Sequence, residues 1–245
     1  MPPRLHVDAP LAAGDAFTLP AGASRHVQVL RLQPGDPITL FDGSGGQWQA
    51  EVVDIGRKAV QARLLVHEAI ERELHTPVTL ALGMPANERM DALVEKAAEL
   101  GAAAIVPLVC ERSVLRLSGE RAERRREHWQ AVAIAACEQS GRNRVPIIHP
   151  PQPLRDWLGK APAAATRLVL SLADGTQPLR TRLAGSNGSP VCLLSGPEGG
   201  LSPAELAAAG AAGFLPTTLG ARVLRADTAP LAALAVVAAL EGSMP

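Results

Sequence analysis

The sequence predicts an α/β protein in which a small strand-rich domain precedes a larger domain of alternating strands and helices. Residues 1–72 contain short, partly alternating apolar runs separated by Pro and Gly turns, whereas strand and helix patterns alternate from residue 78 onward. A charged stretch that ends in a proline, residues 68–77, separates these parts. We therefore expect two domains, 1–72 and 73–245, the second built on a mainly parallel sheet with helices on both faces.

The N-terminal part is expected to form a small β-barrel or sandwich. Its segments with strand-like alternation are residues 38–41, 48–53 and 59–66. Only residues 24–31 have apolar residues at helical spacing, so one helix is expected there.

The larger part alternates strands with helices. Strands are expected at residues 78–82, 105–109, 145–148, 167–172, 191–194 and 214–219. Helices are expected at 88–100, 120–139, 154–158 and 178–184, with a last one ending at Leu240. Gly101 follows the first of these helices and suits the residue just past its end, where left-handed backbone is common.

The last helix is rich in Ala and Leu and has no convincing polar stripe. A helix of this kind needs burial on every side, inside its own domain or against a second copy of the chain. We predict a homodimer, and simple core burial is the alternative.

Composition excludes several classes of protein. Lys plus Arg and Asp plus Glu each total 24, so the formal charge is zero and favours no particular partner. The three cysteines are widely spaced, which indicates reduced core thiols, and the six histidines show no metal-ligand spacing, so no metal is expected. The N-terminus lacks the apolar core of a signal peptide, and the apolar run 231–240 is too short to span a bilayer. We expect a cytoplasmic protein that binds no membrane.

A glycine-rich loop lies between a predicted strand and a predicted helix, at residues 195–201. Ser202 suits the N-cap, Pro203 the first helical position, and Glu205 follows Ser202 by three residues, so Ser-Pro-Ala-Glu forms a capping box. Ligands of open α/β sheets bind beyond the carboxyl ends of strands, where this loop lies. The same pattern also fits a well-capped connection that binds nothing.

A second loop, residues 219–227, follows the next strand and is expected at the same edge of the sheet. It contains Arg222, Arg225 and Asp227, and Asp227 or Thr228 suits the cap of the last helix. Neither loop matches the dinucleotide or the P-loop pattern. The pair predicts a ligand held mostly by backbone, with a cation and a carboxylate nearby.

Arginines cluster between residues 112 and 144, a segment that contains eight arginines and four acidic residues. This surplus is a plausible footprint for RNA phosphates. For residues 121–126 an ordinary solvated helix face is the better interpretation. Arg142 and Arg144 follow a helix end at Gly141, and a tight loop there is expected to project both guanidinium groups toward RNA.

Four motifs in order resemble one known family. They are HVQVLR at 26–31 with LFDG at 40–43, ELG at 99–101 with ACEQSGRNRVP at 136–146, GPEGGLS at 196–202, and LGARVLR at 219–225. They resemble the RsmE family of small-subunit (16S) ribosomal RNA uridine N3-methyltransferases, over residues 4–240. The resemblance implies a PUA-like β-barrel that binds RNA, followed by a SPOUT α/β domain with a trefoil knot. It also implies bound S-adenosylmethionine, an obligate dimer and a 30S ribosomal substrate rather than DNA.

Carried over residue by residue, the resemblance assigns three groups of residues. The cofactor-binding residues are Leu172, Leu194, Gly196, Glu198, Gly199, Leu219, Gly220 and Leu224. The residues assigned to RNA binding are Arg4, Arg25, Arg31, Arg112, Arg142 and Arg144. The catalytic candidates are Arg225, which would hold charge on the uracil, and Asp227 or Glu198, which would accept the N3 proton. The alternative role for either carboxylate is to orient Arg225 or to cap a helix.

The chain departs from the family in places. Ala226-Asp227-Thr228 stands where the family usually has Thr-Glu-Thr, and the loop before residue 88 lacks a common basic residue.

Two alternative functions are considered. One is a related enzyme of the same fold that methylates a ribose 2′-hydroxyl. The other is an RNA-binding assembly factor without catalysis.

Overall fold

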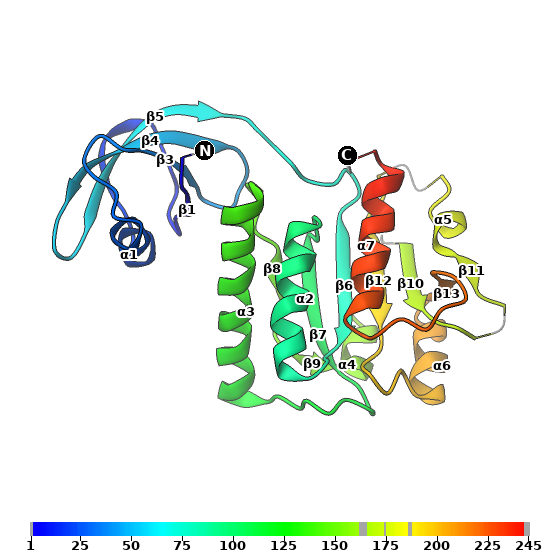
Figure 1. Ribbon diagram of the computed structural model, residues 1–245. Coiled ribbons are helices and arrows are strands. Elements are labelled where there is room, and N and C mark those ends of the chain that lie inside the picture. The colour runs from blue at the N-terminus through cyan, green and yellow to red at the C-terminus, as the bar shows by residue number, and fades with distance from the viewer. Residues whose placement is uncertain (1, 162–165, 174, 186–187, 243–245) are drawn as a thin grey trace. The chain divides into compact units, whose positions relative to one another are not determined.

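The computed structural model describes residues 2–161, 166–173, 175–185 and 188–242 (Figure 1). The chain forms two compact units, one of residues 1–73 and 137–145, and one of 74–136 and 146–245. Helix α3 (Gly119–Ser140) contributes to both, because its last turn belongs to the first unit. The sequence analysis did not predict that residues 137–145 return to the first unit.

The first unit is a five-stranded sheet with one helix. Its elements are β1 (Arg4–His6), β2 (Gly14–Thr18), α1 (Ala21–Val29), β3 (Pro37–Phe41), β4 (Gln47–Ile55) and β5 (Val60–Glu68). The strand order is β1-β3-β4-β5-β2, in which only β1 and β3 are parallel. Apolar side chains from every element, such as Leu5, Val27, Leu40, Val52 and Val60, form its core. The periodicity missed β1 and β2, since three to five residues carry too little pattern.

The second unit is organised around one parallel sheet. Its strands are β6 (Val78–Gly83), β7 (Ala104–Val109), β8 (Ile147–Ile148), β9 (Gln152–Pro153), β10 (Thr166–Leu170), β11 (Gln177–Pro178), β12 (Val191–Ser195) and β13 (Leu215–Thr218). The order is β11-β13-β10-β12-β6-β7-β8, with β9 also on β7, and every pairing is parallel. The predicted parallel sheet is confirmed.

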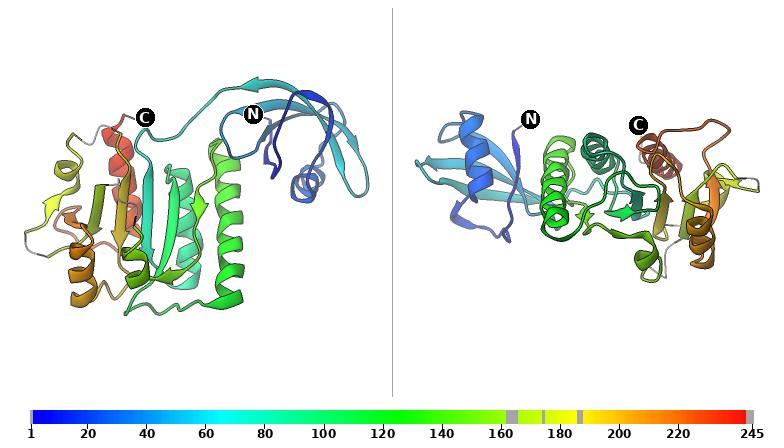
Figure 2. Two further views of the ribbon diagram at one scale, coloured as in Figure 1. Left: turned by 180° about the vertical axis from the view of Figure 1, so that it is seen from behind. Right: turned by 90° about the horizontal axis from the view of Figure 1, so that it is seen from below.

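Helices cover both faces of this sheet. They are α2 (Asn87–Glu99), α4 (Leu154–Leu158), α5 (Leu179–Arg182), α6 (Pro203–Ala211) and α7 (Thr228–Leu240), besides α3. Alternate strand side chains point to opposite faces. Leu80 and Leu193 pack with α2 and α7, whereas Ala81 and Leu194 pack with α4 and α6. The right-hand view in Figure 2 shows the sheet of the second unit between its two layers of helices.

The helix ends test two of the capping predictions. The capping box of α6 is confirmed, because Ser202 Oγ accepts from the Glu205 N–H (3.1 Å) and Glu205 Oε2 accepts from the Ser202 N–H (2.9 Å). The predicted side-chain cap of α7 is wrong. Asp227 stands at the N-cap in a helical conformation without a side-chain capping hydrogen bond, and the Thr228 and Ala229 N–H groups donate to the Arg225 carbonyl instead.

Helix α7 is not buried on every side within the chain. It buries Pro230, Ala233, Leu234, Val237 and Ala238, while its remaining side chains are at least partly exposed, and Leu240 is 55% exposed. Of the two sequence interpretations, complete burial inside the domain is therefore wrong, and a second copy stays a prediction. No helix in the described part of the chain is long and apolar enough to cross a membrane.

Candidate active site

A cavity of about 560 Å³ lies beyond the carboxyl ends of the neighbouring parallel strands β10, β12 and β13. Its walls come from the segment after each strand and from the start of α2. The lining residues are Arg89, Leu170–Leu172, Ser195–Glu198, Gly200, Leu201, Leu206, Thr217, Leu219, Gly220, Arg222–Ala226 and Ala229. The expectation that the two glycine-containing loops share one sheet edge is confirmed. A volume of this size suits a ligand of cofactor dimensions.

The glycine loop after β12 packs too closely for side chains. A Cβ on Gly196 would lie 2.8 Å from the Leu201 nitrogen, and one on Gly83, at the end of β6, would lie 2.5 Å from the Pro197 nitrogen. Gly200 has φ +68°, which side-chain-bearing residues rarely adopt. The loop backbone therefore packs closely against itself and against Gly83, and these neighbours fix its shape.

Contacts from two directions hold the same loop. Glu198 Oε1 accepts from the Ala86 N–H (3.1 Å), just before α2, and lies 3.6 Å from Arg89 Nη1. On the other side, Arg112 Nη1 donates to the Gly199 carbonyl (2.9 Å). The loop is thus tied to the segments that follow β6 and β7, the two strands beyond β12 in the sheet.

The loop after β13 forms the opposite and more exposed wall. Gly220 has φ +116°, and its N–H donates to Thr218 Oγ1 (3.1 Å) in a tight turn. Arg222 and Arg225 line the cavity and are exposed, and Val223 between them is 81% exposed. This wall presents cations and an apolar side chain to whatever enters.

Two known protein families match parts of this chain. Residues 72–238 match the RNA methyltransferase domain family, and residues 19–65 match the RNA methyltransferase PUA domain family. The chain belongs to the RNA methyltransferase family. It is 36% identical to ribosomal RNA small subunit methyltransferase E of Synechocystis, over 87% of this chain and 69% of that protein. It is 31% identical to the protein of the same name from Bacillus subtilis, over 86% of this chain and 84% of that one.

A solved structure of the family is also similar in fold. The ribosomal RNA small subunit methyltransferase E of Neisseria gonorrhoeae, bound to S-adenosyl methionine, is 37% identical and covers 98% of both chains with a TM-score of 0.90. The resemblance to the RsmE family noted in the sequence is therefore confirmed, as is the fold class of a PUA-like domain followed by an α/β domain with a parallel sheet.

Most residues that the family resemblance assigned to the cofactor surround this cavity. Those that line it are Leu172, Gly196, Glu198, Leu219, Gly220 and Leu224, and the catalytic candidate Arg225 lines it as well. Leu194, Gly199 and Asp227 are not among the described lining residues: Leu194 is fully buried beneath the loop, and Asp227 stands at the start of α7. Arg89 was missed. It precedes the glycine loop by about a hundred positions, and only the pairing of β6 with β12 brings it to the cavity.

The predicted RNA-contacting arginines of the first unit have unequal surroundings. The loop at 142–144 does not project both guanidinium groups, because Arg142 is 3% exposed and pairs with Glu73. That prediction is wrong for Arg142, whose neighbouring Asn143 is also buried. Arg144 is exposed and lies 3.3 Å from Glu71.

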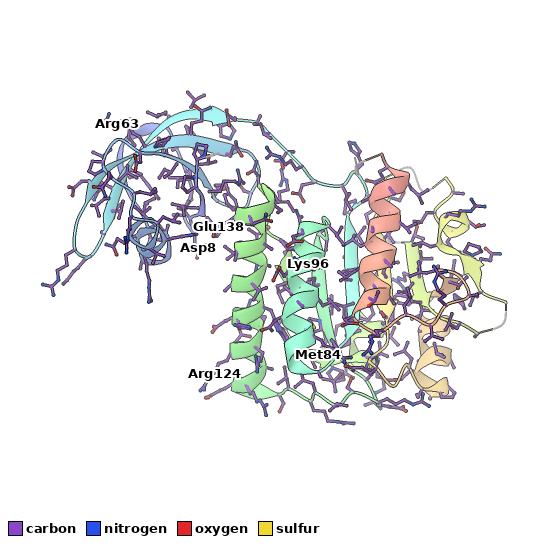
Figure 3. All side chains as sticks on the ribbon, in the orientation of Figure 1. Asp8, Arg63, Met84, Lys96, Arg124 and Glu138 are labelled. Atoms are coloured by element: carbon purple, nitrogen blue, oxygen red, sulfur yellow. The ribbon has the colours of Figure 1, made fainter. Side chains whose placement is uncertain are left out.

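Arg4 is also engaged inside the first unit. Its Nη2 donates to the Arg142 carbonyl (3.0 Å) and to Asn143 Oδ1 (2.7 Å), and its guanidinium lies 4.9 Å from the centre of the Phe41 ring. Glu138, labelled in Figure 3, accepts a hydrogen bond from the N–H of His6, which lies in β1 together with Arg4 (2.9 Å). These contacts fasten residues 137–145 to β1.

Two other predicted RNA contacts in this unit, Arg25 and Arg31, are exposed. Arg31 has φ +56°, a left-handed conformation, and its N–H donates to the Gln28 carbonyl in the turn that ends α1. The guanidinium groups at this helix end are therefore available to a partner.

The cysteines have unreactive surroundings. Burial raises the pKa of the Cys110 and Cys192 thiols to about 12 and that of Cys137 to about 11. Thiolates are the reactive form, so these thiols are inert at neutral pH. Within the described residues, no three His, Cys, Asp or Glu side chains are grouped to hold a metal ion.

Proposed function

We propose that this chain transfers the methyl group of S-adenosylmethionine to N3 of a specific uridine in 16S ribosomal RNA. The observation that carries the proposal is the cavity bounded by the glycine loop after β12 and the loop after β13. Gly196, Gly200 and Gly220 are among its lining residues and carry peptide N–H and C=O groups without side chains, which can match the polar atoms of a neutral adenosine. Membership of the RNA methyltransferase family and the likeness to a relative bound to S-adenosyl methionine support the same cofactor.

The residues present fit that cofactor. A Cβ at Gly196 or Gly83 would collide with loop backbone, so the cradle exists only with glycine at these positions. We assign cofactor contacts to Gly196, Leu219, Gly220, Leu224 and Leu172, with Gly199 and the buried Leu194 supporting the loop. When bound, the sulfonium supplies an activated methyl group, so the protein needs chiefly to align the base and to stabilise charge.

Arg225 is the residue that we assign to the target base. It lines the cavity from the exposed wall, and its guanidinium can donate two parallel hydrogen bonds to an oxygen-bearing planar group. Negative charge develops on the uracil carbonyls as the N3 proton leaves, and a fixed cation stabilises it. Asp227 and Glu198 are the carboxylates that the sequence offers as proton acceptors.

RNA binding by the first unit forms part of the proposal. The match to an RNA methyltransferase PUA domain and the exposed Arg25, Arg31 and Arg144 support it. Arg112 in the second unit is also exposed, although one of its N–H groups is used by Gly199. We propose the assembled 30S subunit as substrate, in the cytoplasm, where a base unstacked in folded RNA is accessible.

We also propose a homodimer. The apolar side chains of α7 that the chain leaves partly exposed include Leu231, Val236 and Leu240, and contact with a second copy would remove them from water. Light scattering tests this proposal, since a dimer has twice the 25.5 kDa mass of the chain. The trefoil knot that the resemblance implies stays a prediction.

The decisive experiment supplies labelled S-adenosylmethionine with 30S particles and, separately, with naked 16S RNA. Mass spectrometry of the nucleosides then locates the methyl group. Label on a ribose 2′-hydroxyl would contradict N3 methylation. A folded protein that binds no S-adenosylmethionine in a calorimetric titration would contradict an enzyme altogether and favour an assembly factor.

Arg225→Ala provides the matching test of the residue assignment. Loss of one preorganised charge-stabilising group costs about 10²–10³-fold in rate. We expect at least that loss of methyl transfer, with light scattering unchanged. Unaltered turnover would remove Arg225 from the mechanism.

A further inference from the structure

The charges that line the cavity are unbalanced. Among its described lining residues three are positive, Arg89 from α2 and Arg222 and Arg225 from the loop after β13. Glu198 is the one negative residue among them, so two positive charges are in excess. S-adenosylmethionine carries a single carboxylate against its sulfonium and ammonium groups, so it is a net cation and does not balance both excess charges. The imbalance fits an anionic group on the other reactant.

Glu198 is poorly suited to accept a proton. Its Oε1 already accepts from the Ala86 N–H at 3.1 Å and lies 3.6 Å from Arg89 Nη1. These two contacts join the glycine loop to the segment that begins α2. Pro197, which approaches Gly83 closely, precedes Glu198 in the same loop. The side chain therefore has a structural use that depends on the carboxylate oxygen as an acceptor.

Asp227, the other carboxylate considered, is not among the described residues that line the cavity. Its Oδ1 faces Thr228 Oγ1 at 3.4 Å, on the first residue of α7. The lining therefore offers three cations and no carboxylate that is free of other contacts.

We propose that the target uracil is methylated as its N3 anion, which Arg89, Arg222 and Arg225 stabilise, and that Glu198 positions the glycine loop instead of accepting the proton. This inference rests on the proposed function. The N3–H bond breaks first and the proton goes to water. The N3 lone pair then forms the bond to the methyl carbon, while the carbon–sulfur bond breaks and its electron pair stays on the sulfur of the neutral thioether product.

Arg89 gains a role by this inference. Opposite charges within a few ångströms favour the ionised form of a group, so cations from two walls lower the free energy of the bound uracil anion. Arg89 contributes from α2, and its pairing with Glu198 fixes its position at the cavity. We assign it to the substrate, alongside Arg222 and Arg225.

The pH dependence of the single-turnover rate tests the inference. An ordinary carboxylate base is ionised throughout the neutral range, so it would give a rate that is flat with pH. Ionisation of the uracil before transfer gives a rate that rises roughly tenfold per pH unit until the bound base is ionised. A flat profile for the wild-type protein would overturn the proposal.

A change in the substrate gives an independent readout. 30S particles reconstituted with 16S RNA that was transcribed with 5-fluorouridine carry a more acidic N3–H, because fluorine withdraws electrons from the ring. We expect their rate profile to shift to lower pH in parallel with their N3 acidity. Identical profiles for the two RNAs would contradict ionisation before transfer.

Two variants at one position separate the roles of Glu198. Glu198→Gln keeps an oxygen that can accept from the Ala86 N–H, whereas Glu198→Ala does not. Loss of a general base costs about 10²–10⁴-fold. We expect Glu198→Gln to lose less than about tenfold and to keep the slope with pH, while Glu198→Ala weakens S-adenosylmethionine binding measured by calorimetry. A loss of 10²-fold or more in Glu198→Gln, with normal cofactor binding, would overturn the proposal.

Arg89→Gln tests whether Arg89 stabilises the bound uracil anion. We expect weaker methyl transfer and a profile displaced to higher pH, because the bound anion has lost one cation. An unmoved profile would remove Arg89 from the substrate. Failure of the proposed function would look different, since no variant and no wild-type reaction would then yield N3-methyluridine.

Discussion

Gly83→Ala tests the glycine cradle most directly. The new Cβ would lie 2.5 Å from both the nitrogen and Cδ of Pro197, whereas ordinary contacts begin near 3.4 Å. Pro197 is itself buried and its nitrogen is main chain, so the loop must move by about 1 Å. Overpacking of this kind costs about 1–3 kcal/mol of stability. A displacement of about 1 Å at a binding site can cost 10²-fold in function.

Calorimetric titration with S-adenosylmethionine and thermal unfolding together measure the effect. We expect affinity to fall at least tenfold, while the midpoint of unfolding falls by roughly 2–4 °C for each kcal/mol lost. Gly210→Ala is the matched control, because Gly210 lies in α6 and an added Cβ there meets nothing within 4 Å. That change should stabilise the protein by roughly 0.5–1 kcal/mol and leave binding intact. Unaltered affinity in Gly83→Ala would refute the cradle.

Two further predictions concern the interior. Glu73→Ala leaves the buried Arg142 guanidinium without its main counter-charge, and loss of one partner of a buried pair costs about 3–5 kcal/mol. Glu51→Ala removes a carboxylate from an exposed pair and should cost less than about 1 kcal/mol, so equal losses in urea unfolding would contradict the distinction. Because burial raises the pKa of Cys110 and Cys192 to about 12, a thiol reagent at pH 7 should label neither until the protein unfolds, and rapid labelling of folded protein would refute this.

The elements that local pattern encodes were predictable. Short apolar runs predicted β6, β7, β8, β10, β12 and β13, and the spacing of Ser202 and Glu205 predicted the start of α6. The two-residue strands β9 and β11 carry too little pattern and were missed. Strand direction then followed from the helices between the strands, which put both glycine-containing loops at one edge. The placement of the two glycine-containing loops at one edge of the sheet was therefore predictable without the tertiary structure.

The errors arose where a distant segment changes the surroundings of a residue. Arg142 follows a helix end, which is ordinarily exposed, but Glu73 lies 69 positions earlier in the chain and neutralises it. A buried arginine needs such a partner, and the sequence gives no sign of which acid provides it. Arg89 was missed for the same reason, because its place at the cavity depends on which strand lies beside β12.

The two walls of the cavity differ in a way that bears on mechanism. The loop after β12 is held by Gly83, Ala86 and Arg112 and therefore keeps its shape before any ligand arrives. The loop after β13 carries the exposed Arg222 and Arg225 and is held by local hydrogen bonds, from the Gly220 N–H to Thr218 Oγ1 and from the Thr228 and Ala229 N–H groups to the Arg225 carbonyl. Under the proposed function the loop after β12 serves the cofactor, whereas the loop after β13 contacts the cofactor through Leu219, Gly220 and Leu224 and the RNA through Arg222 and Arg225. Gly83→Ala should therefore be a defect of cofactor binding. Arg225→Ala keeps those three cofactor contacts and should be a defect of methyl transfer.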